Sequence, residues 1–392
     1  MKKIITFTII LSLTSFLLNA QPCLPNGIVF TSQAQIDNFG QQYNCSEIQG
    51  NVTIMEAVPN DITNLNGLSQ ITKIDGYLSI KHNSHLKYLT GLDNLTEIGD
   101  FLSIYQDDYL KNINALSNVT SIGSYIIIDD NDLLLKITGL SGLDQINGYL
   151  KIKKNPYLSN LEGLDNVTTI SGELQINNNS GLTDMFGLGS LTSIGSNLNI
   201  SYNSNLNNLT GLEQLNTIGG YLNFYSNNNL SDITALSGMT AVDGDITVAL
   251  CNNLASLSGL ENIDPATINS STPGYDDLNF HNNSSLSECE VLSICEVLNN
   301  GGTTNIHDNA SGCNSEAEVT EACTPPECTN LTDPVNGETD VPVNTNLNWA
   351  ESSNADGYNL CVGYTQNCDI FNGDVGNTTT WNPPEDFYCD TT

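Results

Sequence analysis

Five aspartates in two nearby groups are the residues of this sequence best suited, by type and spacing, to chemistry. They are Asp107, Asp108, Asp129, Asp130 and Asp132. Paired carboxylates can act as acid and base in cleaving a glycosidic bond, and several together can bind Ca²⁺ through hard oxygen ligands. The chain contains no arginine, so a lyase-type arginine base is excluded. We interpret the group as a solvated acidic corner, with calcium binding and catalysis as the alternatives.

The four histidines offer a second possible site. His281 and His307 occupy equivalent places in neighbouring repeats, so their imidazoles should lie near one another and near Asp308. Zinc sites normally take three or four ligands, which is more than a histidine pair supplies. We interpret these residues, like His82 and His85, as exposed turn histidines. We expect no catalytic residues, no metal and no cofactor, because no Ser-His-Asp, Cys-His or phosphate-loop arrangement is present.

An outward-pointing column of aromatic residues is the strongest candidate for binding. Tyr77, Phe101, Tyr125 and Tyr149 recur at one spacing, and Tyr105 and the lysines Lys81, Lys151 and Lys153 are close in sequence. One interpretation is a stacked ladder that stiffens an exposed sheet. The other is a binding face, because clustered exposed aromatics mark interaction sites. The candidate ligand-binding residues are therefore Tyr77, Phe101, Tyr125, Tyr149, Tyr105 and Lys151.

A repeat of 24 residues positions these side chains. One apolar column has this spacing without a gap: Leu78, Leu102, Ile126, Leu150, Leu174, Leu198, Leu222 and Ile246. A second column follows two residues later, from Ile80 to Val248. Alternation of apolar and polar residues over 77–81 predicts a half-buried strand. A fixed period of this length indicates a solenoid, in which each unit buries its apolar face against its neighbours.

Two further columns predict the corners of each coil. The first is Asn83, Asp107, Asn131, Asn155, Asn179, Asn203 and Asn227. Asparagine tolerates left-handed backbone and bonds to nearby backbone, so we expect this column to form both the corner and a ladder. The second corner carries glycine, for example Gly91 and Gly163, or alanine. The expected fold is all-β: a parallel β-solenoid of about ten 24-residue leucine-rich coils with disulfide caps, followed by an incomplete β-sandwich.

The units share the pattern I-x-G-x-L-x-I-x-x-N-x-x-L-x-x-L-x-G-L. On these residues the chain resembles the receptor L-domain family, a leucine-rich β-solenoid, in the form found in exported bacterial proteins. The resemblance covers roughly residues 45–323. It implies the solenoid fold and no particular ligand.

Cysteines are expected to close both ends of the solenoid. Cys23 and Cys45 bracket the segment before the first coil and predict an N-terminal clasp. Near the other end are Cys289, Cys295, Cys313 and Cys323, which allow three pairings, and the sequence does not choose between them. The total of 11 cysteines is odd. Cys251 stands in the asparagine column and is the candidate free thiol, with Cys328 and Cys389 as alternatives.

The domain boundaries follow from these features. Residues 1–20 read as a signal peptide, 21–323 as the capped solenoid, 324–326 as a linker and 327–392 as a partial fibronectin type III-like sandwich. Within the solenoid, residues 264–274 carry an insertion that breaks the period. The last segment resembles the fibronectin fold in its alternation around Leu347 and Trp349, but such sandwiches need about 100 residues. We therefore expect a truncated sandwich.

Charge and compartment restrict the partners. The formal charge is −34, every lysine after residue 3 lies in residues 73–154, and the chain beyond is acidic. Such a surface disfavours nucleic acid and anionic membrane, and no stretch after the signal predicts membrane insertion. We expect a secreted or cell-surface, non-enzymatic recognition or adhesion protein that binds an extracellular protein or glycan. A polysaccharide-active enzyme and a passive spacer are the alternatives, and the oligomeric state is not predicted.

Overall fold

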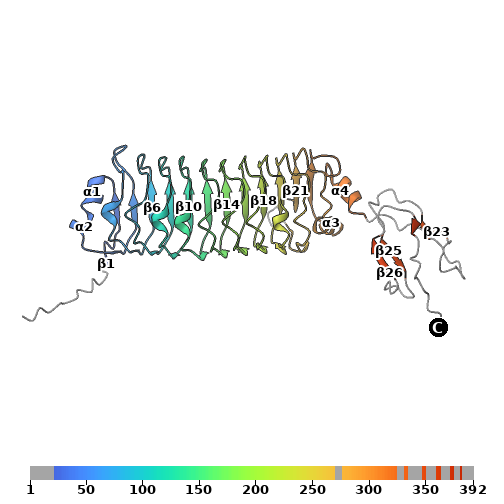
Figure 1. Ribbon diagram of the computed structural model, residues 1–392, viewed down its shortest axis with the longest axis horizontal. Helices are drawn as coiled ribbons and strands as arrows, with labels where there is room; N and C mark the ends of the chain where they lie inside the picture. Colours follow the sequence, from blue (N-terminus) through green and yellow to red (C-terminus); the bar gives the residue numbers. More distant parts are fainter. Residues whose placement is uncertain are drawn as a thin grey trace, which may run out of the picture. The chain divides into compact units, whose positions relative to one another are not determined.

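The computed structural model describes residues 22–269 and 276–324, together with the backbone of five short strands between 331 and 381. The chain forms two compact units, residues 1–323 and 324–392. The first unit is a stack of parallel coils (Figure 1). In the second unit, strands form a three-stranded and a two-stranded antiparallel sheet. These strands are β23 (Leu331–Asp333), β24 (Leu347–Trp349), β25 (Asn359–Val362), β26 (Phe371–Asp374) and β27 (Thr380–Trp381).

The long face of the solenoid is one 12-stranded parallel sheet. Its strands are β2 (Ile28–Phe30), β4 (Val52–Ile54), β6 (Leu78–Lys81), β8 (Leu102–Tyr105), β10 (Ile126–Asp129), β12 (Leu150–Lys153), β14 (Leu174–Asn177), β16 (Leu198–Ser201), β18 (Leu222–Tyr225), β20 (Ile246–Ala249), β21 (Leu278–His281) and β22 (Thr304–His307). The parallel solenoid predicted from the repeat is confirmed. The sheet also includes β2, which lies before the first predicted coil.

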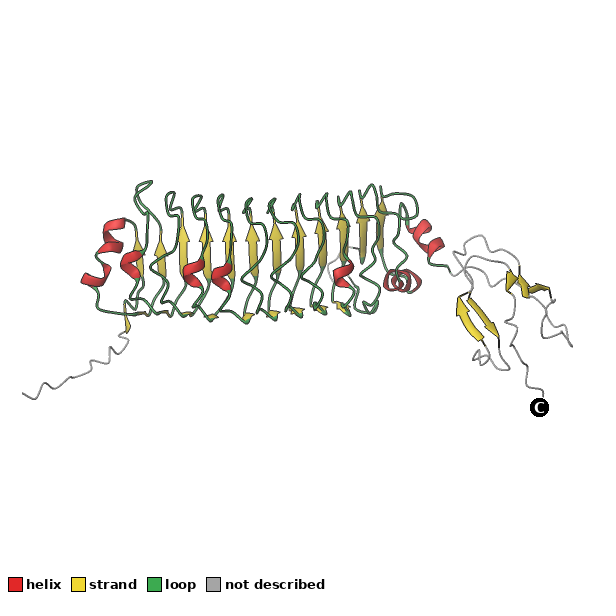
Figure 2. Cartoon of the chain, in the orientation of Figure 1, coloured by secondary structure: helices red, strands yellow, loops and turns green. Residues whose placement is uncertain are grey.

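Two shorter sheets run along another side of the coils, five strands in each. The first contains β1 (Pro22–Cys23), β3 (Glu47–Ile48), β5 (Lys73–Ile74), β7 (Glu97–Ile98) and β9 (Ser121–Ile122). The second contains β11 (Gln145–Ile146), β13 (Thr169–Ile170), β15 (Ser193–Ile194), β17 (Thr217–Ile218) and β19 (Ala241–Val242). Figure 2 shows how little helix the coils contain. The α-helices are α1 (Gln33–Asp37), α2 (Phe39–Gln42), α3 (Leu292–Asn299) and α4 (Glu316–Ala322), all near the ends of the solenoid.

The pairing register explains the unbroken apolar columns. Leu78 pairs with Leu102, and Ile80 with Ile104, so equivalent residues lie directly above one another along the stack. These side chains have no exposed surface. Each strand of the long sheet therefore buries alternate residues in one continuous core, and the other residues form the outer face.

The asparagine column forms the predicted ladder inside the corner. Asn155, for example, donates from its backbone N–H to Oδ1 of Asn179 at 3.0 Å, and its Nδ2 donates to the carbonyl of Ile128 at 3.0 Å. The expectation that this column also forms the left-handed corner was wrong. The positive-φ residue is the one before it, as in Lys154 (φ 51°) and Tyr202 (φ 58°). The asparagine instead points inward, where its amide can reach two neighbouring coils.

The second corner takes two forms. Glycines such as Gly91 and Gly163 have φ of 113° and 114°, and a Cβ there would meet the backbone of the preceding coil. Four other coils turn through a short 3-10 helix at this place: η1 (Asn66–Leu68), η2 (Asn114–Leu116), η3 (Thr138–Leu140) and η4 (Thr234–Leu236). Ala115 and Ala235 belong to this second form, in which a 3-10 turn keeps φ negative.

Within the described residues, three disulfides lie at the two ends of the solenoid. Cys23 bonds to Cys45, as predicted for the N-terminal clasp. At the other end, Cys289 bonds to Cys313 and Cys295 to Cys323, which selects one of the three possible pairings. Cys251 is a buried free cysteine, as predicted. The break in the period is also seen, because Ile246 pairs with Leu278, 32 residues later. Residues 270–274 of the 264–274 insertion lie outside the described residues.

Candidate ligand-binding face

The aromatic stripe, defined as Tyr77, Phe101, Tyr125 and Tyr149, is built by strands β6 to β12. Each residue directly precedes one of these strands, and the in-register pairing places the four side chains on consecutive coils. The ring centroids are 4.5, 4.7 and 4.3 Å apart along the stripe, with interplanar angles of 15°, 6° and 12°. The interpretation as a stacked ladder is confirmed.

This stacking decides which part of each ring a ligand could touch. The strand spacing of about 4.8 Å leaves room for parallel rings but for nothing between them. The inner ring faces are therefore covered, and the stripe offers ring edges and hydroxyl groups to a ligand. All four residues are half-buried. Burial, and then the neighbouring Tyr149, raise the pKa of the Tyr125 hydroxyl.

Lys151 covers the end of the stripe. Its Nζ lies 4.6 Å from the centroid of the Tyr149 ring, a cation–π contact, and 3.2 Å from a carboxylate oxygen of Glu173 on the next coil. Lys153 pairs with Asp129 across the sheet at 3.1 Å. Both lysines are thus close to compensating carboxylates, which reduces the positive charge that this face offers to an anionic ligand.

Tyr105 lies apart from the stripe. It is the last residue of β8, whereas Phe101 precedes that strand, so the two residues are at opposite ends of the strand. The ring of Tyr105 packs edge-to-face on His82, with centroids 5.3 Å apart. Of the six candidate residues, five lie in or against the stripe and Tyr105 belongs to the neighbouring corner.

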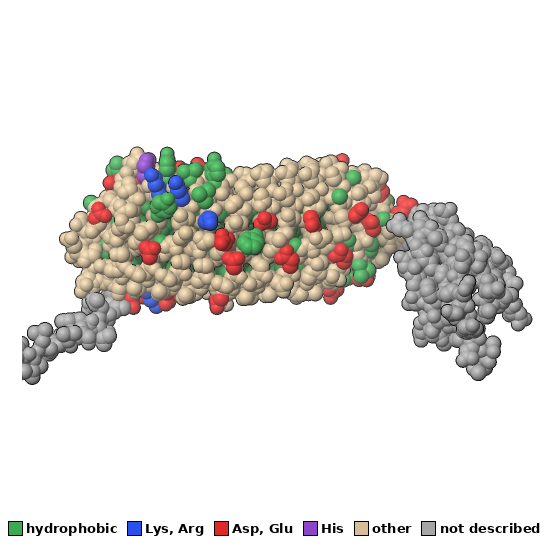
Figure 3. All heavy atoms as spheres, viewed as in Figure 1, with side chains coloured by type: hydrophobic (Ala, Val, Ile, Leu, Met, Phe, Trp, Pro, Cys, Tyr) green, Lys and Arg blue, Asp and Glu red, His purple; other side chains and the backbone are tan. Residues whose placement is uncertain are grey.

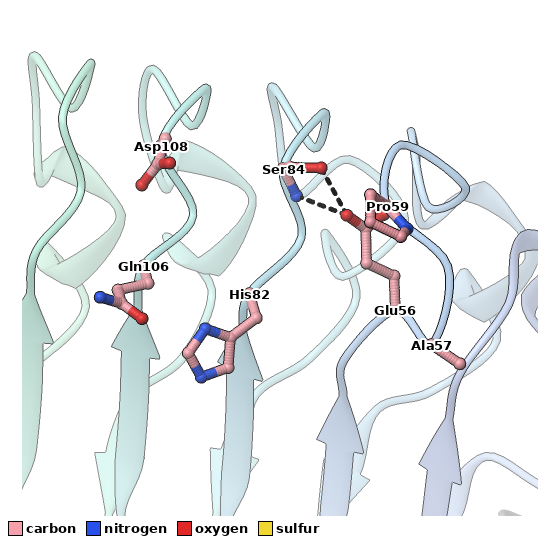
Figure 4. A pocket seen from close by; sticks show the side chains of 7 residues that line it. All are labelled: Glu56, Ala57, Pro59, His82, Ser84, Gln106 and Asp108. Carbon is pink, nitrogen blue, oxygen red and sulfur yellow. Dashed lines mark hydrogen bonds between the residues drawn. The ribbon is translucent and has the colours of Figure 1, made fainter.

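That corner contains a shallow pocket of about 420 Å³. Its lining consists of Glu56, Ala57, Pro59, His82, Ser84, Gln106 and Asp108, drawn in Figure 4. Glu56 is already engaged: one carboxylate oxygen accepts from both the N–H and the hydroxyl of Ser84. Desolvation raises the pKa of Glu56, but the hydrogen bonds from Ser84, Asn60 and Ile62 outweigh it and hold the pKa below its ordinary value. The Glu56 carboxylate is therefore already used in hydrogen bonds within the protein.

The acidic corner is less uniform than a solvated group. Asp107 has no exposed surface, so the expectation that it lies on the solvated corner was wrong. It replaces an asparagine of the buried ladder. Asp108 and Asp132 are exposed; burial, and then the neighbouring Asp132 and Asp130, raise the pKa of Asp108. Within the described ranges, no three His, Cys, Asp or Glu side chains are grouped to hold a metal ion.

The two late histidines do lie together, as predicted. The rings of His281 and His307 stack with centroids 5.2 Å apart, and Nδ1 of His307 is 2.8 Å from a carboxylate oxygen of Asp308. Burial, and then the neighbouring His307, lower the pKa of His281.

Four exposed large side chains on successive coils were missed by the sequence reasoning. Tyr88, Tyr109, Leu135 and Tyr157 are 45, 44, 46 and 59% exposed. They follow the corner residue of the asparagine column by two to five residues on successive coils, and so occupy different register positions. Figure 3 shows hydrophobic side chains, lysines and a histidine gathered at the upper edge of the N-terminal coils. The signal was available: Tyr109 and Tyr157 each precede a buried leucine, and later coils have glycine or asparagine there.

The segment that matches a known family includes the coils that carry most of the stripe. Residues 44–136 match the Receptor L domain family. The match runs from before β3 to beyond β10 and includes three of the four stripe residues, all but Tyr149. No curated protein matches the chain. Within the described part of the chain, no helix has the length and apolarity needed to cross a bilayer.

Proposed function

We propose that the chain is a secreted or cell-surface, non-enzymatic recognition protein that binds an extracellular protein or glycan on the face of β6 to β12. The observation that carries the proposal is the coincidence of the aromatic stripe with the matched Receptor L domain segment. A receptor domain points to extracellular ligand binding. The disulfides at both ends of the solenoid agree with an oxidising compartment.

The chemistry of the stripe narrows the mode of binding. Aromatic ring edges carry partial positive charge and their hydroxyls can donate or accept hydrogen bonds. Oxygen-rich partners, such as sugar hydroxyls and peptide carbonyls, suit this surface better than planar groups that stack on ring faces. Later coils place Glu173, Asn197, Tyr221 and Asp245 at the equivalent column, so consecutive aromatic rings occur only on the earlier coils.

We further propose the domain arrangement that accompanies this function. Residues 1–20 would direct export, 21–323 would form the recognition solenoid, 324–326 the linker, and 327–392 a partial fibronectin type III-like sandwich. The signal peptide and most of the last domain lie outside the described residues.

The proposal is tested by screening the exported protein on a glycan array and by cross-linking it to intact cells of its source. Saturable binding of the labelled solenoid to a partner, reduced by an excess of unlabelled solenoid, supports recognition. Turnover of acidic or neutral polysaccharides that is abolished by D108N and D130N would instead favour the enzyme. Absence of any partner, with normal phenotype after deletion of two coils, would favour a spacer.

A further inference from the structure

One acid occupies a ladder of buried amides. Asp107 takes the place that asparagine holds in the neighbouring coils, and none of its surface is exposed. Its Oδ1 accepts from the backbone N–H of Asn83 at 2.8 Å and from Nδ2 of Asn83 at 2.9 Å. Asn155 accepts from Asn131 in the same two ways. Asp107 therefore supplies the acceptor half of the ladder.

The donor half is where an acid and an amide differ. Nδ2 of Asn131 donates to the carbonyl of Ile104, 27 residues earlier in the chain, at 3.3 Å. The same step of 27 residues recurs from Asn179 to Ile152 and from Asn203 to Ile176, at 2.8 and 3.0 Å. By this register, Oδ2 of Asp107 takes the place of the amide nitrogen and faces the carbonyl of Ile80.

Oδ2 of Asp107 is buried and has no hydrogen-bond partner. An ionised oxygen in that place would face the lone pairs of a carbonyl away from the protein surface, and a buried charge without a partner is strongly unfavourable. A proton on Oδ2 changes the repulsion into an O–H···O=C hydrogen bond and restores the pattern of the ladder.

The surrounding charges act in the same direction. Desolvation is the largest cause that raises the pKa of Asp107, to about 7; the bonds from Asn83 lower it, and the carboxylates of Asp108 and Glu56 raise it further. The titratable groups close to the corner in sequence are Asp108 on the same coil, Lys81, His82 and His85 around Asn83, Asp129, Asp130 and Asp132 around Asn131, and Glu56 two coils away. The two carboxylates that act on Asp107, those of Asp108 and Glu56, both favour its neutral form.

We propose that the folded protein holds Asp107 as a neutral carboxylic acid whose Oδ2–H donates to the Ile80 carbonyl, and that loss of this proton loosens the N-terminal coils. The consequence is a proton-sensitive element inside the solenoid. The unfolded chain releases this proton near the ordinary aspartate pKa of about 3.9, whereas the folded protein keeps it until about pH 7. Between these values the folded state binds the extra proton, so stability falls as the pH rises and levels off above the folded pKa.

The test compares thermal unfolding of the full-length wild type, D107N and the exposed control D132N at pH 5 and pH 8. We expect D107N to raise the unfolding temperature by roughly 5 °C at pH 8, to change it little at pH 5, and to flatten the pH dependence. D132N should keep the wild-type pH dependence. An unchanged pH dependence in D107N, or equal destabilisation at both pH values, would overturn the proposal.

A second measurement does not depend on how the variant folds. Infrared spectra of the wild type at pH 6 should contain a protonated-carboxyl C=O band that disappears between pH 6 and pH 8. In D107N, or with unfolded wild type if that variant does not fold, this pH-dependent band should be missing. A wild-type spectrum without the band at pH 6 shows an ionised Asp107 and contradicts the proposal.

Discussion

The backbone N–H of Asn155 donates to Oδ1 of Asn179 on the next coil, at 3.0 Å, and both residues are completely buried. The same bond recurs from Asn131 to Asn155 and from Asn179 to Asn203. Each amide thus ties its own coil to the next and also satisfies carbonyl groups of the corner. The hydrophobic columns and the pairing of the parallel strands hold the coils together, and this ladder adds side-chain hydrogen bonds between coils at the corner.

Asn155→Ala should lower the free energy of unfolding by about 3 kcal/mol. The change removes the acceptor of the Asn131 N–H and the donor to the Ile128 carbonyl, and each buried polar group left unsatisfied costs about 1–3 kcal/mol. Chemical denaturation of the full chain measures the effect. The matched control is Asn229→Ala at an exposed position, which should change stability by less than about 0.5 kcal/mol. Equal effects of the two substitutions would argue against a structural ladder.

Ser226→Gly should stabilise the protein by about 0.5–1 kcal/mol. Ser226 has φ of 57° at the left-handed corner, where a side chain costs about 1–2 kcal/mol, partly offset by the greater freedom of glycine in the unfolded chain. Ser226→Val at the same position should destabilise, because a branched side chain tolerates positive φ poorly. Thermal unfolding of the three proteins gives the order; a valine variant as stable as the glycine variant would contradict the corner geometry.

Cys251 should not react with thiol reagents in the folded protein at pH 8. Its side chain has no exposed surface, and burial raises the pKa of the thiol to about 11, so the reactive thiolate is scarce below that pH. Alkylation followed by peptide mapping should label this residue only after denaturation. Rapid labelling of native protein, or recovery of Cys251 in a disulfide-linked peptide, would show that the thiol is accessible or paired.

The parts of the fold that depend on period could be predicted from the sequence. Leu78 and Leu102 share a column because they share a place in the core, and the Cys23–Cys45 disulfide follows from its position before the first coil. The details that depend on local geometry could not. The left-handed position is occupied by residues as different as Lys154 and Leu250, so no residue type identifies it in the sequence. The recurring asparagine is the residue that follows it, and that residue is buried.

The local geometry of the candidate site could not be predicted from the sequence either. A column of aromatics is visible in the sequence, but the side-chain angle that stacks Phe101 on Tyr125 is not, and that angle decides whether faces or edges are exposed. Asp107 and Asp108 are adjacent in the chain, yet one is buried and the other exposed. Strand alternation did not separate them, because the corner after the strand interrupts its period of two.

The most direct test of the account is the affinity of the captured partner for F101S/Y125S, measured by biolayer interferometry beside the wild type and Tyr221→Ser. Tyr221 occupies the same column on a later coil, outside the stripe. We expect the double variant to remain folded, since both side chains point away from the core, and to lose about 1–3 kcal/mol of binding free energy if the rings anchor the partner. Tyr221→Ser should bind like the wild type. Wild-type affinity of a folded double variant, or equal loss in the control, would contradict recognition through the stripe.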